Sequence, residues 1–168
     1  MQYKELPETY SLLLQSSATA SAQNLVRPFP YTNKNNVTWR VNYDQLFNGR
    51  QELFEFCRVR FQLVEGSNVG STLNQNQGYI SASFSTDFNA QTTNGCILGL
   101  IVAQENTIGG TDGVFIANGQ NDVGVDINHK QLIGVQPLTI QWINSSGDGM
   151  SGITQDYSLE IMFEFYNM

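Results

Sequence analysis

The single histidine of the chain, His129, is the first residue to consider for chemistry. It stands in the stretch DINHKQ, directly after a predicted strand. A metal centre built on imidazole needs several histidines with a carboxylate, and a serine triad needs a motif such as Gly-x-Ser-x-Gly. Neither pattern accompanies His129. We therefore expect it to lie in a surface loop near the end of a strand.

Three aspartates form a candidate calcium loop. Asp112, Asp122 and Asp126 stand among asparagines and glycines, and such oxygen-rich loops suit calcium. The spacing and closing glutamate of an EF-hand are absent, however, and Asp, Asn and Gly are also typical of turns. We favour turns and expect no metal site.

Glutamates on neighbouring strands are the other candidate catalytic groups. Glycoside hydrolysis needs two acids on facing strands, and Glu160, Glu164 and Glu55 could approach one another. Charged residues on an outer face are the simpler interpretation. The sequence thus predicts no catalytic residue and no cofactor. We expect that the protein is not an enzyme, and a hydrolase is the least favoured hypothesis.

The composition also limits the partners. The chain has 168 residues, a net charge of −7 and only 14% charged residues, while 17 Asn and 15 Gln supply much of its polarity. No block of Lys or Arg is present, which disfavours nucleic acid and anionic membrane surfaces as partners. The first residues, MQYKELPETYSLLLQSS, do not fit a secretion signal or a membrane span, so we expect a protein made in the cell interior.

Nearly all of the chain reads as short strands separated by Gly, Asn and Ser turns. In residues 157–166, large apolar residues alternate with others, which is typical of a strand with one buried face. Residues 37–43 alternate likewise, and the apolar run at residues 96–104 predicts a strand buried on both faces. The only helical candidate is the turn DQLFNG, where Asp44 would cap and Gly49 would terminate a helix.

About nine strands and almost no helix predict an all-β fold. Loops longer than hairpins need favour an antiparallel β-sandwich with a single jelly roll of about eight strands, plus a short N-terminal strand at residues 10–16. In a jelly roll the last strand lies beside the first, so residues 157–166 are expected in the middle of a sheet. Residues 1–168 form one domain, with residues 1–36 as a candidate extended N-terminal arm.

The inward positions of these strands define the expected core. It comprises Trp39, Val41, Val59, Phe61, Leu100, Trp142, Leu159, Ile161 and Phe163. An alternative role for the two tryptophans, stacking on sugar rings, is less favoured because both fall in the inward register. Cys57 and Cys96 are expected as buried free thiols rather than as a disulfide.

The predicted strand at residues 52–65 leaves several large side chains outside the core. Leu53 is expected to face inward, whereas Phe54, Phe56, Arg58 and Arg60 are expected to face outward. Tyr166 of the last strand faces outward in the same way. Exposed apolar groups often mark an interface, so these five outward residues are candidate assembly contacts. The alternative is that other segments of the chain cover them.

Four stretches together resemble the single jelly-roll capsid proteins of large icosahedral DNA viruses. They are YSLLLQSS, VTWRVNYDQLF, FEFCRVRFQLVEG and YSLEIMFEFY. In that family a short first strand is followed by an aromatic alternating strand, a short turn, a long arginine-containing strand and a final alternating aromatic strand. The resemblance spans most of the chain and rests on pattern.

The resemblance implies a structural protein of the virion, either a minor capsid protein between larger capsomers or a penton protein at the vertices. Its implied partners are other copies of itself, as a trimer or pentamer, and larger capsid proteins. The basic arm with which small RNA-virus capsid proteins bind their genome is absent, so no nucleic-acid contact is expected.

A non-catalytic binding module is the rival hypothesis. It would be a carbohydrate-binding domain, or a trimeric jelly roll of the tumour-necrosis-factor or complement kind. Jelly rolls of that kind usually act outside the cell, which the lack of a predicted secretion signal disfavours. Calcium-dependent melting or retention on a polysaccharide would favour the binding module.

Overall fold

The computed structural model describes most of the predicted strands. The described residues are 6–16, 35–66, 78–85, 91–92, 95–101, 124–144, 146–149 and 157–168. The strands are β1 (Glu8–Gln15), β2 (Asn36–Asn42), β3 (Phe56–Gly66), β4 (Gly78–Ala82), β5 (Gln91–Thr92), β6 (Gly95–Ile101), β7 (Val125–Ile127), β8 (Val135–Asn144) and β9 (Tyr157–Tyr166). The helices are α1 (Tyr43–Phe47) and the 3₁₀ helices η1 (Arg50–Leu53) and η3 (His129–Gln131). One further predicted strand, the short stretch GVFIAN at residues 113–118, lies outside the described residues.

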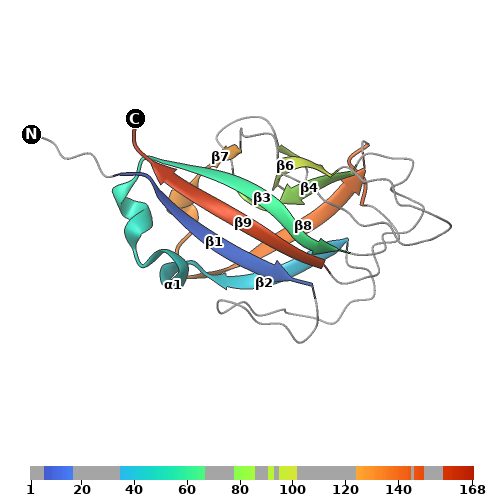
Figure 1. The fold of residues 1–168 in the computed structure, drawn as a ribbon, viewed down its shortest axis with the longest axis horizontal. Coiled ribbons are helices and arrows are strands. Elements are labelled where there is room, and N and C mark those ends of the chain that lie inside the picture. Colours follow the sequence, from blue (N-terminus) through green and yellow to red (C-terminus); the bar gives the residue numbers. More distant parts are fainter. Residues whose placement is uncertain are drawn as a thin grey trace, which may run out of the picture.

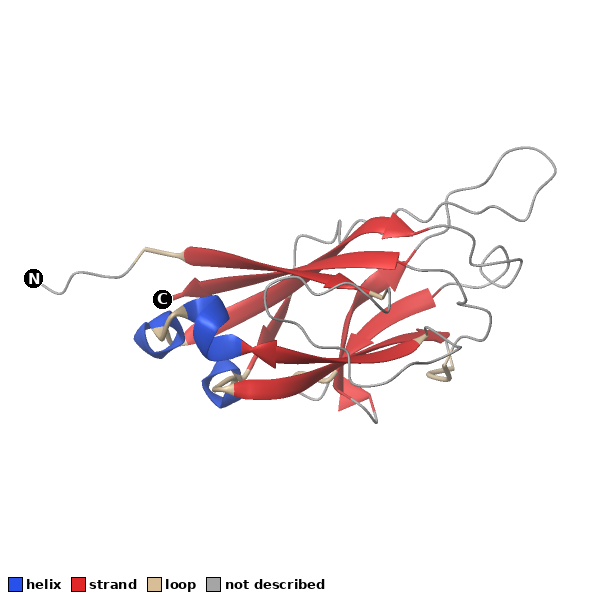
Figure 2. Cartoon of the chain, turned by 90° about the horizontal axis from the view of Figure 1, so that it is seen from below, coloured by secondary structure: helices blue, strands red, loops and turns tan. Residues whose placement is uncertain are grey.

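These strands form two antiparallel sheets that pack against each other (Figure 1, Figure 2). One sheet has the order β1-β9-β3-β7, and the other has the order β2-β8-β4-β6-β5. The chain crosses from one sheet to the other after β1, β2, β3, β6, β7 and β8, so most consecutive strands lie in opposite sheets. This is the arrangement of a jelly roll, with four main strands in each sheet and β5 added at one edge. The predicted all-β sandwich is confirmed.

Strand β9 lies in the middle of the four-stranded sheet, as the sequence predicts. It pairs with β1 on one side and with β3 on the other, both antiparallel. Its inward side chains are all buried, and they are Tyr157, Leu159, Ile161, Phe163 and Phe165. Burying one large apolar side chain contributes roughly 1.5–3 kcal/mol relative to exposure. Strand β9 therefore supplies two hydrogen-bonded ladders and a large part of the core.

The predicted core is confirmed wherever the structure describes the side chains. Eight of the nine expected residues are buried: Trp39, Val41, Val59, Phe61, Trp142, Leu159, Ile161 and Phe163. The side chain of the ninth, Leu100 in β6, lies outside the described part of the chain. The cysteines Cys57 and Cys96 are buried and free, as expected, and burial raises the pKa of both thiols.

Helix α1 begins at Tyr43, two residues earlier than a cap at Asp44 predicts. Asn42 caps it, because its side-chain oxygen accepts a hydrogen bond from the Gln45 N–H at 3.1 Å. The expected cap, Asp44, lies in the first turn instead. After α1, Asn48 (φ 51°) and Gly49 (φ 72°) take the left-handed backbone conformation that ends helices.

The turn at Asn48 and Gly49 delays the start of β3. The chain forms the 3₁₀ helix η1 first, and β3 begins at Phe56 rather than at residue 52. Period-two alternation does not apply before Phe56, so two predicted orientations are wrong. Leu53 is 46% exposed instead of inward, and Phe54 is 1% exposed instead of outward.

Strand β6 is buried on one face rather than on both. Cys96 and Leu98 are buried, but Ile97 between them is 37% exposed. The next residue, Gly99, lies opposite Phe61 of the other sheet, where an added Cβ would stand 2.6 Å from the phenyl Cε1 atom. A glycine at this position therefore allows the two sheets to approach closely.

Part of the candidate N-terminal arm is a strand of the sandwich. Within residues 1–36, the segment Glu8–Gln15 is strand β1 and belongs to the four-stranded sheet. Residues 1–5 and 17–34 lie outside the described residues.

Candidate functional site

Four of the five predicted assembly residues lie together on the outer face of the four-stranded sheet. Phe56, Arg58 and Arg60 come from β3, and Tyr166 comes from β9. The strand register places Phe56 opposite Tyr166 and Arg58 opposite Glu164, while β7 places Asp126 on the other side of Arg58. The outer-face cluster is defined as Phe56, Arg58, Arg60, Asp126, Glu164 and Tyr166.

Aromatic and cationic groups are layered in this cluster. The rings of Phe56 and Tyr166 stack with a centroid distance of 5.3 Å and an interplanar angle of 23°. The guanidinium carbon of Arg58 lies 5.3 Å from the centroid of the Tyr166 ring, which is within the range of a cation–π contact. The two aromatic rings and the planar guanidinium group of Arg58 thus form a half-buried surface that is already ordered within one chain.

Ion pairs and hydrogen bonds fix the arginines in place. The Arg58 Nε atom lies 3.5 Å from Asp126 Oδ1, and the Tyr166 hydroxyl donates to the same oxygen at 3.0 Å. Arg60 Nη2 donates to Glu164 Oε2 at 2.8 Å. Each ion-paired side chain remains about one-third exposed, so these pairs contribute little to folding stability individually. Their effect is to orient the cluster.

The outer-face cluster is balanced in charge. Two arginines face two carboxylates. Burial, followed by the hydrogen bond to Asp126, raises the pKa of Tyr166, so its hydroxyl stays neutral and donates at physiological pH. A neutral surface of Tyr, Phe and Arg has the composition of protein–protein interfaces, where these residues are enriched.

Phe54 does not belong to this cluster, contrary to the sequence prediction. Its ring stacks on that of Phe165 in the core, with a centroid distance of 5.7 Å and an interplanar angle of 29°. Phe54 follows η1 and precedes β3, and it therefore turns to the inner face. Its role is to close the core beneath the end of β9.

His129 is also buried, at 2% exposure, so the prediction of a surface-loop histidine is wrong. Its Nε2 atom lies 3.1 Å from the carbonyl oxygen of Gln51 and 3.0 Å from that of Phe54. Both partners are acceptors, which assigns the proton to Nε2. The ring meets Phe165 edge-on, and burial lowers the pKa of His129. His129 therefore joins η3 to η1 as a neutral hydrogen-bond donor.

The polarity of its neighbours explains why sequence reasoning missed the burial of His129. Lys130 and Gln131, which follow it in η3, are both exposed. A buried residue at the start of a short polar turn has no periodic signal. Only the packing of η3 against η1 shows its position.

The carboxylates considered for catalysis and calcium binding are placed as follows. Asp126 joins the outer-face cluster, while Asp112 and Asp122 lie outside the described residues. Glu160 and Glu164 are half-buried on the outer side of β9, and Glu55 is exposed. Within the described ranges, no three His, Cys, Asp or Glu side chains stand close enough together to hold a metal ion. None of the helices in that same part of the chain has the length and apolar character to span a membrane.

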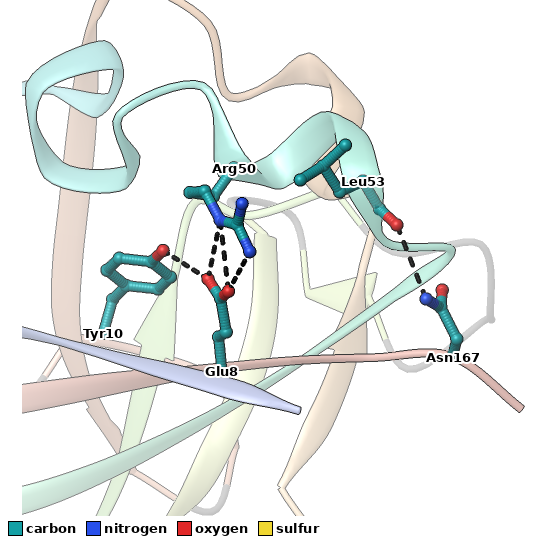
Figure 3. Close-up of polar contacts among 5 residues, drawn as sticks. All are labelled: Glu8, Tyr10, Arg50, Leu53 and Asn167. Carbon is teal, nitrogen blue, oxygen red and sulfur yellow. Dashed lines mark hydrogen bonds and ion pairs between the residues drawn. The ribbon is translucent and has the colours of Figure 1, made fainter. Parts of the chain in front are cut away.

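A second polar network joins the start of β1 to the turn before β3 (Figure 3). Arg50 forms an ion pair with Glu8, and the Tyr10 hydroxyl donates to the same carboxylate at 2.6 Å. These hydrogen bonds, that from Arg50 first, lower the pKa of Glu8. Beside them, the Asn167 side chain donates to the Leu53 carbonyl at 3.4 Å. The network fastens η1 to the start of β1 and to Asn167, which follows the end of β9.

One end of the sandwich carries the helices together with the start of β1 and the end of β9 (Figure 1). Among the described residues, five of the six exposed large hydrophobic side chains are at this end: Leu6, Leu53, Ile133, Val135 and Met168. The sequence did not predict this grouping, because the five residues come from four separate stretches of the chain that only the fold brings together.

No protein-family model matches the chain, and no curated protein sequence matches it.

Proposed function

We propose that this protein is a structural component of a viral icosahedral capsid, either a minor capsid protein or a vertex protein. It acts through contacts with other copies of itself and with larger capsid proteins, and its place is in the virion. The jelly-roll fold supports this proposal without deciding it, because one fold serves many functions.

The positions of the capsid-like stretches support the proposal further. YSLLLQSS covers most of β1, VTWRVNYDQLF covers β2 and α1, and YSLEIMFEFY is β9. FEFCRVRFQLVEG covers β3. The resemblance therefore falls on strands of both sheets, rather than on connections.

The outer-face cluster is the observation that carries the proposal. An assembly protein needs a rigid surface that is polar enough to stay soluble alone and flat enough to pack against a neighbour. Tyr166 and Arg58 meet this need, since aromatic and arginine side chains dominate binding energy at interfaces. Because the arginines already have carboxylate partners within the chain, a neighbour can cover them without leaving a charge unpaired.

The sugar-binding alternative gains no support from the tryptophans. Trp39 and Trp142 are both buried, and the Trp39 indole N–H donates to the Gln15 carbonyl at 3.1 Å. Neither indole face is open to a sugar ring. A trimeric binding module with the same fold is an outcome that the experiment below distinguishes.

The test is the mass of the chain in solution by size exclusion with light scattering, with and without calcium. We expect a trimer or pentamer that is indifferent to calcium, and five copies would favour a vertex position. Assembly must then depend on the outer-face cluster. The double variant Phe56→Ser and Tyr166→Ser should dissociate it, whereas Leu53→Ser, an exposed apolar residue at the helical end, should leave it intact.

Other results would count against the proposal. A calcium-dependent mass or melting temperature, or retention on polysaccharide resins, would favour the binding module. If Leu53→Ser dissociated the oligomer and the double variant did not, the assembly contact would lie at the apolar end of the sandwich instead. A chain that stays monomeric alone and fails to bind any larger capsid protein co-expressed with it would overturn the proposal.

A further inference from the structure

The two sheets have four edge strands, and one of them differs from the others. Strand β7 has three residues and β5 has two, and short edges of this kind resist pairing with other chains. Strand β1 pairs with β9, and its residues Ser11 and Leu13 make further contacts within the chain. Strand β2 is seven residues long and contains no glycine, proline or bulge. Strands β1, with eight residues, and β2 are the two long edges of the described structure (Figure 1).

The backbone of β2 presents a row of hydrogen-bonding groups away from β8. The Trp142 N–H donates to the Asn35 carbonyl at 2.7 Å, and the Tyr43 N–H donates to the Gly134 carbonyl at 2.9 Å. In an antiparallel ladder every second residue bonds to the neighbour, so odd-numbered residues of β2 bond to β8. The N–H and C=O groups of Asn36, Thr38 and Arg40 therefore point to the open side.

Proline usage in β8 agrees with this assignment. Pro137, which lacks an N–H, lies opposite Arg40, at a position where no hydrogen bond joins the two strands. No hydrogen bond joins the outward backbone groups of β2 to any other described residue. A row of such groups is a template for an added strand.

We propose that β2 pairs with β2 of a second copy of this chain, antiparallel and about a two-fold axis through Trp39. The residue order of the strand supports a second copy as the partner. Asn-Val-Thr-Trp-Arg-Val-Asn reads almost the same in both directions. Two-fold pairing at Trp39 therefore places asparagine opposite asparagine and valine opposite valine.

Side-chain charge is compatible with this register. Arg40, the charged residue of β2, comes opposite Thr38 of the second copy, so no like charges meet. The valines and Trp39 lie on the inner face and are buried, while Thr38 and Arg40 lie on the outer face. Across the two-fold axis, the inner face of one copy's sheet is therefore continuous with the inner face of the other copy's sheet. The two outer faces are continuous in the same way.

This pairing goes beyond the proposed capsid function and does not depend on it. A two-fold contact closes on two copies and cannot by itself form a trimer or pentamer. In a shell it would link neighbouring oligomers. The β2 edges could pair even if the outer-face cluster made no assembly contact. Equally, the outer-face cluster could make assembly contacts even if the β2 edges did not pair.

The test uses residue-resolved hydrogen exchange on the full chain from micromolar to millimolar concentration. In a monomer the amides of Asn36, Thr38 and Arg40 donate to no described residue, so we expect them to exchange fast. With pairing we expect roughly tenfold or greater slowing of these three amides as concentration rises, because paired backbone groups exchange only on opening. Fast exchange at every concentration overturns the proposal.

Arg40→Pro and Arg40→Thr form a matched pair of variants. Proline removes an N–H that donates to no described residue, yet it blocks strand addition. Threonine removes the same charge and keeps the N–H. Pairing should also double the mass of the protein as concentration rises. We expect Arg40→Pro to abolish both this doubling and the slowing of amide exchange. We expect Arg40→Thr to keep both. A folded Arg40→Pro protein that still doubles its mass with concentration overturns the pairing. Should Arg40→Pro fail to fold, exchange in the wild-type chain and in Arg40→Thr decides the question.

Discussion

At the scale of single residues, two phenylalanines two positions apart should behave differently. Phe54 is buried against Phe165, whereas Phe56 is half-buried and stacks on Tyr166 at the surface. Replacing a buried phenylalanine by alanine leaves a cavity and costs about 3–5 kcal/mol. Losing a surface aromatic pair costs about 1 kcal/mol. Urea denaturation of Phe54→Ala and Phe56→Ala should show this difference, and equal losses would contradict the assigned orientations.

His129 predicts a dependence of folding stability on pH. Its folded pKa lies below the ordinary value of 6.5, because burial disfavours the charged ring. On acidification the unfolded chain therefore binds the proton first. The contribution of His129 is fully present above pH 6.5, and it is lost as pH falls through the folded pKa.

Unfolding free energies measured between about pH 8 and about pH 5 test this, with His129→Gln as the variant that cannot titrate. The wild-type protein should lose more stability over that interval than the variant does. Glu8 does not interfere, because its pKa is lowered from 4.5 and its contribution is lost only in more acidic solution. Equal losses in the two proteins would mean that His129 is not buried as a neutral ring.

At the scale of elements, the position of β9 predicts the result of a truncation. Removing residues after Tyr157 takes away a strand that pairs with β1 and with β3, together with four buried large side chains. The sheet would then be divided in two, and we expect no cooperative thermal transition by circular dichroism. A chain lacking only Met168, which is exposed, should melt normally. A soluble truncated chain that melts cooperatively would contradict this topology.

The elements also show where sequence reasoning succeeds and where it fails. Strands β2 and β9 could be predicted because one face of each is buried over its whole length, which imposes strict alternation. The errors at Leu53, Phe54 and His129 share one cause. The left-handed residues Asn48 and Gly49 redirect the chain into η1, and η3 packs against it. This local change of chain direction alters which residues face the core, but the sequence keeps the same alternation of apolar and polar residues.

At the scale of the whole molecule, the candidate site could be predicted only in part. Phe56, Arg58 and Arg60 share one face of one strand, so their spacing is sufficient to group them. Asp126 and Tyr166 reach the same face through pairing between distant strands. Sequence alone did not bring Asp126 to this face, because strand order is a property of the complete fold.

Net charge predicts how salt affects self-association. Each copy carries −7, so copies repel one another at long range. The charged groups of the outer-face cluster have partners within the same chain, so assembly need not depend on ion pairs between copies. Raising salt from about 0.1 M to about 1 M shortens the Debye length from about 10 Å to about 3 Å, which screens the repulsion.

We therefore expect higher salt to strengthen the oligomer, measured as the midpoint concentration of assembly by light scattering. Sodium chloride should suffice, because the effect is screening and needs no specific ion. The Arg40→Pro variant isolates contacts other than the β2 edge and should respond in the same direction. Dissociation at high salt would instead reveal ion pairs between copies. In that case Arg58 and Arg60 would exchange their carboxylate partners on assembly, and the outer-face cluster would act as a charged rather than a neutral surface.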